Sequence, residues 1–274
     1  MLCPIPYEHF LETAPKDYAS GVNTIRNFEK LSGGYIFRQE LIITTQLIIS
    51  LLRKNNVTIN TYCNKDSEIT FTNPENYDKT KVFKQDVKAT FTESLEDINI
   101  IRNASRGFKS TLEFDRNAYE LMKKRAEREF NQRLLWAYKG KRIFVRADQF
   151  GDKQVPNWID SIIYRLFEVH KITPREIERL MKHIEKRGFM DFPQLDIKKS
   201  LIGLNAIQQK KEQESDHIDF IRLAVGLPPS DILFTDKRRK AEIVELGLDK
   251  KYKCHVFSGT PEDLKSFKEL IRSL

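Results

Sequence analysis

Four aspartates fall within one short stretch of the chain, residues 216–239, where they can act together: Asp216, Asp219, Asp231 and Asp236. Asp216 and Asp219 are three residues apart, so on a helix they point to one side. Asp231 precedes a short apolar segment that we expect as a strand, and Asp236 closes it. In open α/β sheets, ligands collect outside the carboxyl ends of strands. Clustered carboxylates of this kind are typical of a Mg2+ or Mn2+ site, because these hard cations prefer oxygen ligands.

Simple structural roles also explain most of these residues. Asp216 can cap the helix that follows it, in competition with Ser215. Asp231 follows a Pro-Pro-Ser sequence and fits an ordinary turn. Asp219 lies between apolar residues of the same helix and is the hardest of the four to explain as a surface residue. Spacing alone therefore leaves both a metal site and a set of structural aspartates open.

A run of four basic residues follows the last aspartate: Lys237, Arg238, Arg239 and Lys240. Asp236 can pair with the first two of them or cap the helix that they begin. The basic run can contact phosphates of a nucleic acid beside the acidic residues. Its alternative is an exposed helix face.

Composition and charge limit the function classes. With 274 residues, of which 40% are hydrophobic, the chain is long enough to bury a sizeable core. The formal net charge of +8 is compatible with an anionic partner, nucleic acid first. The longest apolar run, residues 41–52, is interrupted by polar residues and is too short to span a bilayer.

Cysteine usage and the N-terminal residues indicate a cytoplasmic protein. Cys3, Cys63 and Cys254 are odd in number and far apart, which favours reduced thiols over disulfides or a zinc site. The first residues lack a basic segment followed by a long apolar core, so no signal peptide is predicted. We expect no membrane association.

The elements that must position the aspartates are strands and helices in alternation. We predict strands at residues 232–234 and 254–257 with a helix at 237–246 between them, an order that favours a parallel sheet. Thr260 is expected to cap a final helix. The middle of the chain is predicted mostly helical, at these ranges: 21–37 with a break at 32–34, 38–53, 92–103, 110–138, 157–170, 174–187 and 197–211. Weak strands are expected at 68–72 and 143–145.

Two segments resemble the PIN-like nuclease superfamily. Residues 216–240 match the family's C-terminal part: an Asp-rich helix, a Leu-Pro turn, then Asp, apolar residues, Thr, Asp and Lys. The N-terminal Cys-Pro-Ile-Pro-Tyr-Glu-His-Phe-Leu-Glu resembles the family's second strand and the helix that carries its acidic residue, which corresponds to Glu12. Together the two segments cover about a quarter of the chain.

The resemblance implies an α/β fold with three layers and a short parallel sheet, enlarged by a mostly helical insertion. Residues 1–38 and 195–274 would form the discontinuous core, and residues 39–194 the insertion. PIN-like domains are typically metal-dependent nucleases that act mostly on RNA. By resemblance, Glu12, Asp219 and Asp236 would be catalytic ligands of Mg2+ or Mn2+, and Asp216 or Asp231 would assist. RNA is then expected as partner in preference to DNA.

In the family, a first strand ending in a catalytic aspartate precedes the part that matches here. We therefore expect that strand before Met1, although residues 142–145 leading to Asp148 are an alternative. Two further hypotheses stand beside the nuclease. One is a catalytically inactive PIN-like module that binds nucleic acid or protein, and the other is a helical scaffold in which the aspartates are caps and surface residues.

Overall fold

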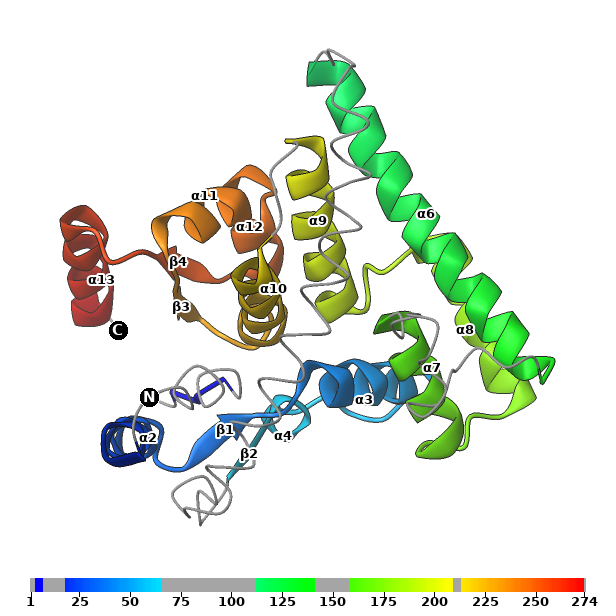
Figure 1. Cartoon of the computed structure of the whole chain (residues 1–274), viewed down its shortest axis with the longest axis horizontal. Coiled ribbons are helices and arrows are strands. Elements are labelled where there is room, and N and C mark those ends of the chain that lie inside the picture. Colours follow the sequence, from blue (N-terminus) through cyan, green and yellow to red (C-terminus); the bar gives the residue numbers. More distant parts are fainter. Residues whose placement is uncertain (1–2, 7–17, 66–111, 141–157, 209–212, 274) are drawn as a thin grey trace.

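The computed structural model of the chain describes residues 3–6, 18–65, 112–140, 158–208 and 213–273. Its elements, in chain order, are α2 (Tyr18–Ser32), β1 (Tyr35–Phe37), α3 (Glu40–Arg53), α4 (Ile59–Tyr62), β2 (Cys63–Lys65), α6 (Leu112–Tyr138), α7 (Trp158–Glu168), α8 (Pro174–Arg187), α9 (Pro193–Ile207), α10 (Glu214–Gly226), β3 (Ile232–Phe234), α11 (Lys237–Glu245), α12 (Leu248–Tyr252), β4 (His255–Phe257) and α13 (Pro261–Ser273). The described part is mostly helical and contains two sheets of two strands each (Figure 1). The expected mixed α/β class is confirmed at this level.

The parallel strand pair near the C-terminus confirms the sequence prediction. β3 and β4 pair in parallel, with Leu233 opposite Val256. The chain passes between them through α11 and α12, as a parallel pair requires a crossover connection. Both strands are rich in β-branched, aromatic and apolar residues, which suit a half-buried pleated surface.

The second strand pair corrects a prediction. The helix predicted at 21–37 does end at its predicted break, since α2 ends at Ser32, but the segment after the break, Tyr35–Phe37, is the strand β1 and not helix. Gly33 and Gly34 take positive φ values of 60° and 81°, which end the helix. β1 then pairs with β2 in antiparallel orientation, and Ile5 bridges Ile36 in parallel. Long-range pairing therefore decides the structure of this segment.

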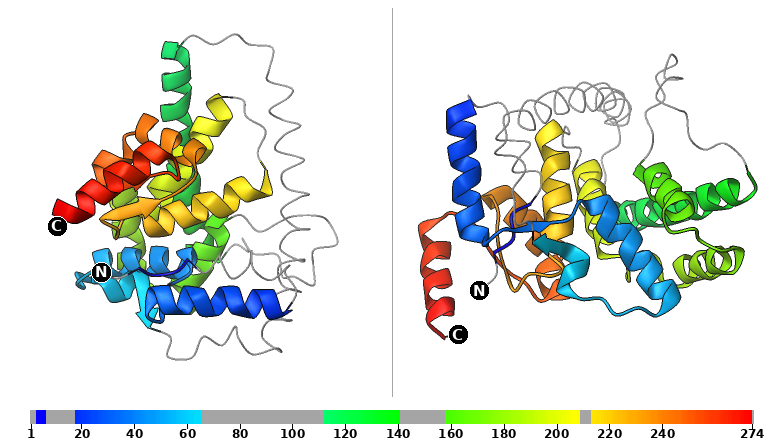
Figure 2. Two further views of the ribbon diagram at one scale, coloured as in Figure 1. Left: turned by 90° about the vertical axis from the view of Figure 1, so that its left-hand side faces the viewer. Right: turned by 90° about the horizontal axis from the view of Figure 1, so that it is seen from below.

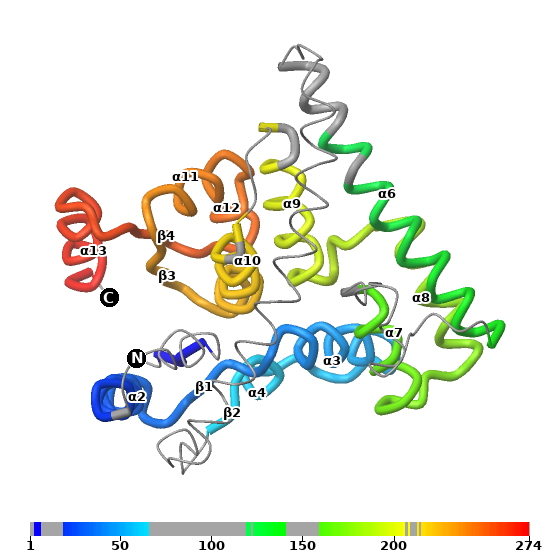
Figure 3. The backbone as a smooth tube through the Cα atoms, viewed as in Figure 1, coloured from blue at the N-terminus to red at the C-terminus, as the bar shows by residue number. Residues whose placement is uncertain are grey.

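Apolar residues gather in two main clusters that meet at α9. The larger cluster joins α3, α6, α7 and α8 and includes Leu195 of α9. The other joins α9 to α10, α11, α12 and β4, and includes Ile197 and Leu201 of α9. Figure 3 shows α9 between α10 and the long α6. The predicted boundary at residues 194/195 thus falls inside one helix whose sides serve both clusters.

A buried carboxylate ties three helices together. Asp196 of α9 accepts hydrogen bonds from Lys251 Nζ (2.8 Å) and the Tyr252 hydroxyl (2.9 Å) of α12. Lys123 of α6 lies 3.2 Å from its other oxygen. Burial alone would raise the pKa of Asp196, but the two lysines outweigh it and lower that pKa. The carboxylate is therefore held in its charged form.

Local sequence patterns predicted several helix ends correctly. α8 begins at the capping box of Thr173 and Glu176 with Pro174 at its first position, and ends at Gly188. Thr260 Oγ1 accepts from the Asp263 amide at the start of α13. The predicted elements at 68–72, 92–103 and 143–145, and Asp148, lie outside the described residues. Within the described part, the helices are too short or too polar to cross a membrane.

Candidate functional site

The acidic residues of α10 lie on the side of that helix that faces α11. Asp216 is the third residue of α10, and its Oδ2 accepts a hydrogen bond from the Gln213 amide (2.9 Å). The N-cap is Gln213, and Asp216 completes a capping box with it. Neither Asp216 nor Ser215 is therefore the N-cap, which was the structural role predicted for one of them. Asp216 is buried, whereas Asp219, one turn later, is half-buried. The two carboxylates do share one side of the helix, as predicted.

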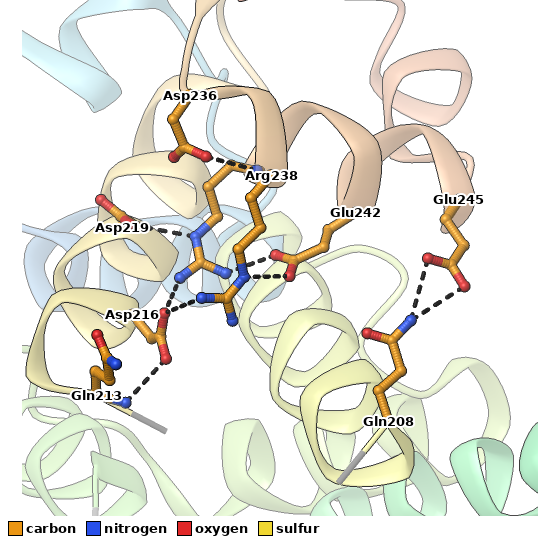
Figure 4. A network of polar contacts seen from close by, with 9 residues as sticks. Gln208, Gln213, Asp216, Asp219, Asp236, Arg238, Glu242 and Glu245 are labelled. Atoms are coloured by element: carbon orange, nitrogen blue, oxygen red, sulfur yellow. Dashed lines mark hydrogen bonds and ion pairs between the residues drawn. The ribbon is translucent and has the colours of Figure 1, made fainter. Parts of the chain in front are cut away.

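Arg239 of α11 lies between these carboxylates. Its side chain is 1% exposed. Its Nη2 donates to Asp216 Oδ1, its Nε to Asp219 Oδ2 (3.2 Å) and its Nη1 to Glu242 Oε2 (2.6 Å). Its guanidinium also lies 4.8 Å from the ring centre of Phe220 on α10, within the range of a cation–π contact. One buried cation thus joins three carboxylates from two helices. Figure 4 shows these carboxylates, Asp216, Asp219 and Glu242, facing one another.

A second arginine covers this cluster from the solvent side. The side chain of Arg238 is 43% exposed, and its Nη1 lies 3.2 Å from Asp216 Oδ1. Its Nε donates to Glu242 Oε1 at 3.1 Å, so both oxygens of Glu242 are bonded to arginines. The Glu242 side chain is 3% exposed. Glu242 is not among the site residues predicted from the sequence, although its spacing of three and four residues from the two arginines indicates such pairs on a helix.

The electrostatics keep Arg239 charged. Burial alone would lower the pKa of Arg239, but the hydrogen bond to Glu242 and the charges of Glu242 and Asp216 outweigh it and raise that pKa. Burial raises the pKa of the Asp219 carboxyl, Arg239 opposes this shift, and the negative charge of Asp236 adds to it. Asp219 and Asp236 are therefore close enough to repel one another.

Asp236 is the N-cap of α11. Its Oδ1 accepts a hydrogen bond from the Arg239 amide at 3.0 Å, and its backbone has the extended conformation of a cap. This is one of the two structural roles considered for it. Asp231 is exposed and lies at the other end of β3, where its carbonyl accepts from the His255 amide (2.8 Å). Since a strand rises roughly 3.3 Å per residue, Asp231 and Asp236 do not converge on one ion.

Three of the carboxylates bond an arginine at the place where the sequence predicts Mg2+ or Mn2+. The oxygens that face one another from Asp216, Asp219 and Glu242 are bonded to a guanidinium, which occupies the position that an ion shared by them would need. Within the described ranges, the structure shows no cluster of three or more His, Cys, Asp or Glu residues arranged to hold a metal. Glu12, the remaining predicted ligand, lies outside these ranges.

The basic run is divided between interior and surface. Lys237 and Arg238 are exposed, as phosphate contacts require. Lys240 is half-buried and forms an ion pair with Asp263 of α13. Arg239 points inward, so the contact with phosphates predicted for it is not available in this arrangement. The helical period places Arg239 and Ile243, both buried, on the inner side of α11.

The arrangement joins α10 to α11 through an acidic cluster filled by arginine, with cations on its outer side. Its chemistry is that of charge pairing between the two helices. Comparisons of the chain with protein-family models, with curated proteins and with solved structures found no match.

Proposed function

We propose that the chain is a cytoplasmic nucleic-acid-binding protein with a PIN-like core, in which Arg239 takes the place of a metal ion as partner of the acidic cluster. The observation that carries the proposal is how the charged residues in and beside α11 are divided between the interior and the surface. Asp216 and Glu242 are buried against Arg239, while Lys237 and Arg238 are exposed. The buried carboxylates are therefore paired within the protein, and Lys237, together with the exposed part of Arg238, is available to a partner.

The C-terminal strand pair supports the PIN-like core. β3 and β4 are parallel, and Asp236 follows the carboxyl end of β3, where open α/β sheets bind ligands. The Asp-rich helix of the resemblance corresponds to α10, which packs beside this pair in the smaller apolar cluster. The division into a core of residues 1–38 and 195–274 and an insertion of residues 39–194 belongs to the same proposal.

Charge supports a nucleic acid as the partner. The formal net charge is +8, and phosphate contacts from Lys and Arg supply most of the sequence-independent affinity of such proteins. RNA is proposed ahead of DNA because the resembling family acts mostly on RNA. The cysteines form no disulfide within the described part, in keeping with a cytoplasmic location.

Binding measurements with and without metal test the proposal. Labelled single-stranded RNA and DNA of equal length are titrated with the protein at low salt, in EDTA or in Mn2+, and binding is followed by fluorescence anisotropy. We expect similar affinity in EDTA and in Mn2+, a steep decrease with added salt, and intact oligonucleotides on a denaturing gel. The absence of any binding at low salt would contradict the proposal.

A second candidate is the metal-dependent nuclease of the resemblance, with Glu12, Asp219 and Asp236 as its catalytic residues. The observation that favours it is that Asp219 and Asp236 both reach solvent, and that burial, with the negative charge of Asp236 adding to it, raises the pKa of the Asp219 carboxyl. Cleavage of the RNA in Mg2+ or Mn2+, lost in Asp219→Asn and Asp236→Asn but kept in Asp231→Asn, would replace the first proposal with this one.

A further inference from the structure

One face of α8 carries four basic side chains in a line, which we call the α8 stripe: Arg175, Arg179, Lys182 and Lys186. Successive members are four, three and four residues apart, the spacing that aligns side chains along a helix. All four are exposed. With a rise of 1.5 Å per residue, the stripe extends roughly 16 Å along the helix axis.

The members of the α8 stripe have no anionic partner in the described part of the chain. Other arginines in and beside α8 do: Arg187 pairs with Asp191, and Arg53 pairs with Glu176. Glu178 and Glu185 flank the stripe on one side, and neither forms an ion pair within 4.0 Å with a described residue. Paired cations thus hold α8 in place, while the unpaired ones gather on its outer face.

The inner face and both ends of α8 are fixed. Ile177, Leu180 and Ile184 are buried in the larger apolar cluster. Hydrogen bonds cap the first turn, and Arg53 reaches across from α3 to Glu176 with an Nε–Oε1 distance of 2.7 Å. The stripe is therefore presented on a rigid support, which reduces the conformational entropy that a partner would have to remove.

Like charges at these spacings destabilise a helix when nothing offsets them. In the α8 stripe, each neighbouring pair has this spacing. Glu178, three residues after Arg175 and four before Lys182, offsets part of the repulsion, and an anionic partner would offset more of it. A partner with charges repeated along a line matches the stripe best. One strand of a duplex carries a phosphate for roughly every 3.4 Å of rise along the duplex axis, so its backbone is a regularly repeating row of negative charge.

We infer that the α8 stripe is a contact surface for the sugar–phosphate backbone of a nucleic acid; this inference rests on the proposed nucleic-acid binding and adds a second surface to α11. Arginine binds phosphate oxygens in pairs, and lysine binds them as a point charge, so the stripe contains both kinds of contact. A membrane surface fits less well, because the apolar face of α8 is buried in the core and cannot enter a bilayer. The contact is independent of base sequence.

The surface lies away from the basic residues of α11. Figure 1 and the right-hand view of Figure 2 place α8 at the opposite end of the molecule from α13, to which α11 is joined by the ion pair of Lys240 and Asp263. Substitutions on α8 therefore leave the α10–α11 cluster intact. The two surfaces can be tested separately.

The test removes the four charges of the stripe at once. The stripe variant carries Arg175→Gln, Arg179→Gln, Lys182→Gln and Lys186→Gln, and glutamine is a good helix former. The control variant removes four exposed cations elsewhere and so has the same net charge: Lys250→Gln, Lys265→Gln, Lys268→Gln and Arg272→Gln. Binding of labelled single-stranded RNA and of duplex DNA is measured over a range of salt, with circular dichroism to confirm the fold.

We expect the stripe variant to bind at least about tenfold more weakly at low salt. We also expect four lost phosphate contacts to reduce the slope of log affinity against log salt by about three units with single-stranded RNA and by about three and a half with duplex DNA. The control variant is expected to keep most of the wild-type slope. Equal loss in both variants would show a general charge effect and overturn the inference, while the proposed function would stand. If the wild type binds no nucleic acid, both the inference and the proposed function are overturned. If the wild type binds anionic lipid vesicles but not nucleic acid, and only the stripe variant loses that binding, the stripe is a membrane-binding surface instead.

Discussion

Arg239 and Asp216 form an ion pair between α11 and α10 in which both side chains are removed from solvent, with 1% and 2% of their surface exposed. A buried carboxylate is costly unless a cation and hydrogen bonds satisfy it. Here Arg239 satisfies Asp216 and Glu242 together, and it also reaches the half-buried Asp219. The acidic residues for which the sequence predicts a metal site therefore also connect α10 to α11 in the interior of the protein.

Replacement of Arg239 by methionine leaves two buried carboxylates without their main partner. We expect Arg239→Met to lower the free energy of unfolding by about 3 kcal/mol, since removal of one partner of a buried pair leaves an uncompensated charge. Arg238→Met is the matched control, and because that side chain is 43% exposed we expect a loss of about 1 kcal/mol or less. Urea unfolding followed by circular dichroism measures both. Equal losses in the two variants would contradict the central role of Arg239.

Asp236 caps α11, so its substitution is expected to change the stability of the protein in the absence of any metal. We expect Asp236→Ala to destabilise the protein by about 1 kcal/mol and Asp236→Ser to restore most of that loss, because serine also caps helices well. Asp231→Ala is the control, since the exposed Asp231 side chain forms no cap or ion pair with another described residue and its loss is expected to change stability little. Thermal unfolding of the three variants measures the effect. If serine does not restore stability, the cap contributes less than its hydrogen bond indicates.

Local patterns predicted those parts of the fold that depend on neighbours in the sequence. The capping box at Thr173, the strands β3 and β4 and the helix between them follow from residue types within a few positions. The strand β1 was missed because its partners, Ile5 and β2, are about thirty residues away in either direction. Propensity cannot detect a strand that tertiary pairing creates.

The orientation of single side chains in the acidic cluster also depends on residues that are distant in the sequence. The sequence shows four adjacent basic residues, and their types alone do not say which of them turns inward. That choice follows from the packing of α11 on α10, whose aspartates lie about twenty residues earlier. Two local features of the sequence do indicate that Arg239 turns inward. It lies on the same side of the helix as the apolar Ile243, and it is three residues before Glu242.

Glu176 makes the stability of α8 depend on pH. Its hydrogen bond with Arg53, together with bonds from Thr173, lowers the pKa of Glu176 from 4.5 to about 2. A carboxyl whose pKa is lower in the folded state stabilises the protein above its unfolded pKa, and this contribution is lost as the pH falls from 4.5 towards 2. We expect wild type to lose more stability over this window than Glu176→Gln, in which the capping box is kept but the charge is absent.

The measurement for Glu176 is the urea midpoint as a function of pH, with Glu178→Gln as the control. Glu178 is exposed on the same helix and forms no ion pair with a described residue, so its variant is expected to follow the wild-type curve. If Glu176→Gln and wild type lose stability in parallel, the pair of Arg53 and Glu176 does not contribute in solution.

The three cysteines are expected to differ in reactivity. Burial raises the pKa of the Cys63 thiol to about 11 and that of the Cys254 thiol to about 12, and Asp231 and Asp249 add to the shift at Cys254. Cys3 is exposed. Because the thiolate is the reactive form, brief treatment of the folded protein with iodoacetamide near neutral pH is expected to modify Cys3 alone. Intact-mass spectrometry with peptide mapping is expected to show one adduct in the native protein and three after unfolding in urea. Rapid modification of Cys254 in the native protein would contradict this and show that β4 separates readily from the core.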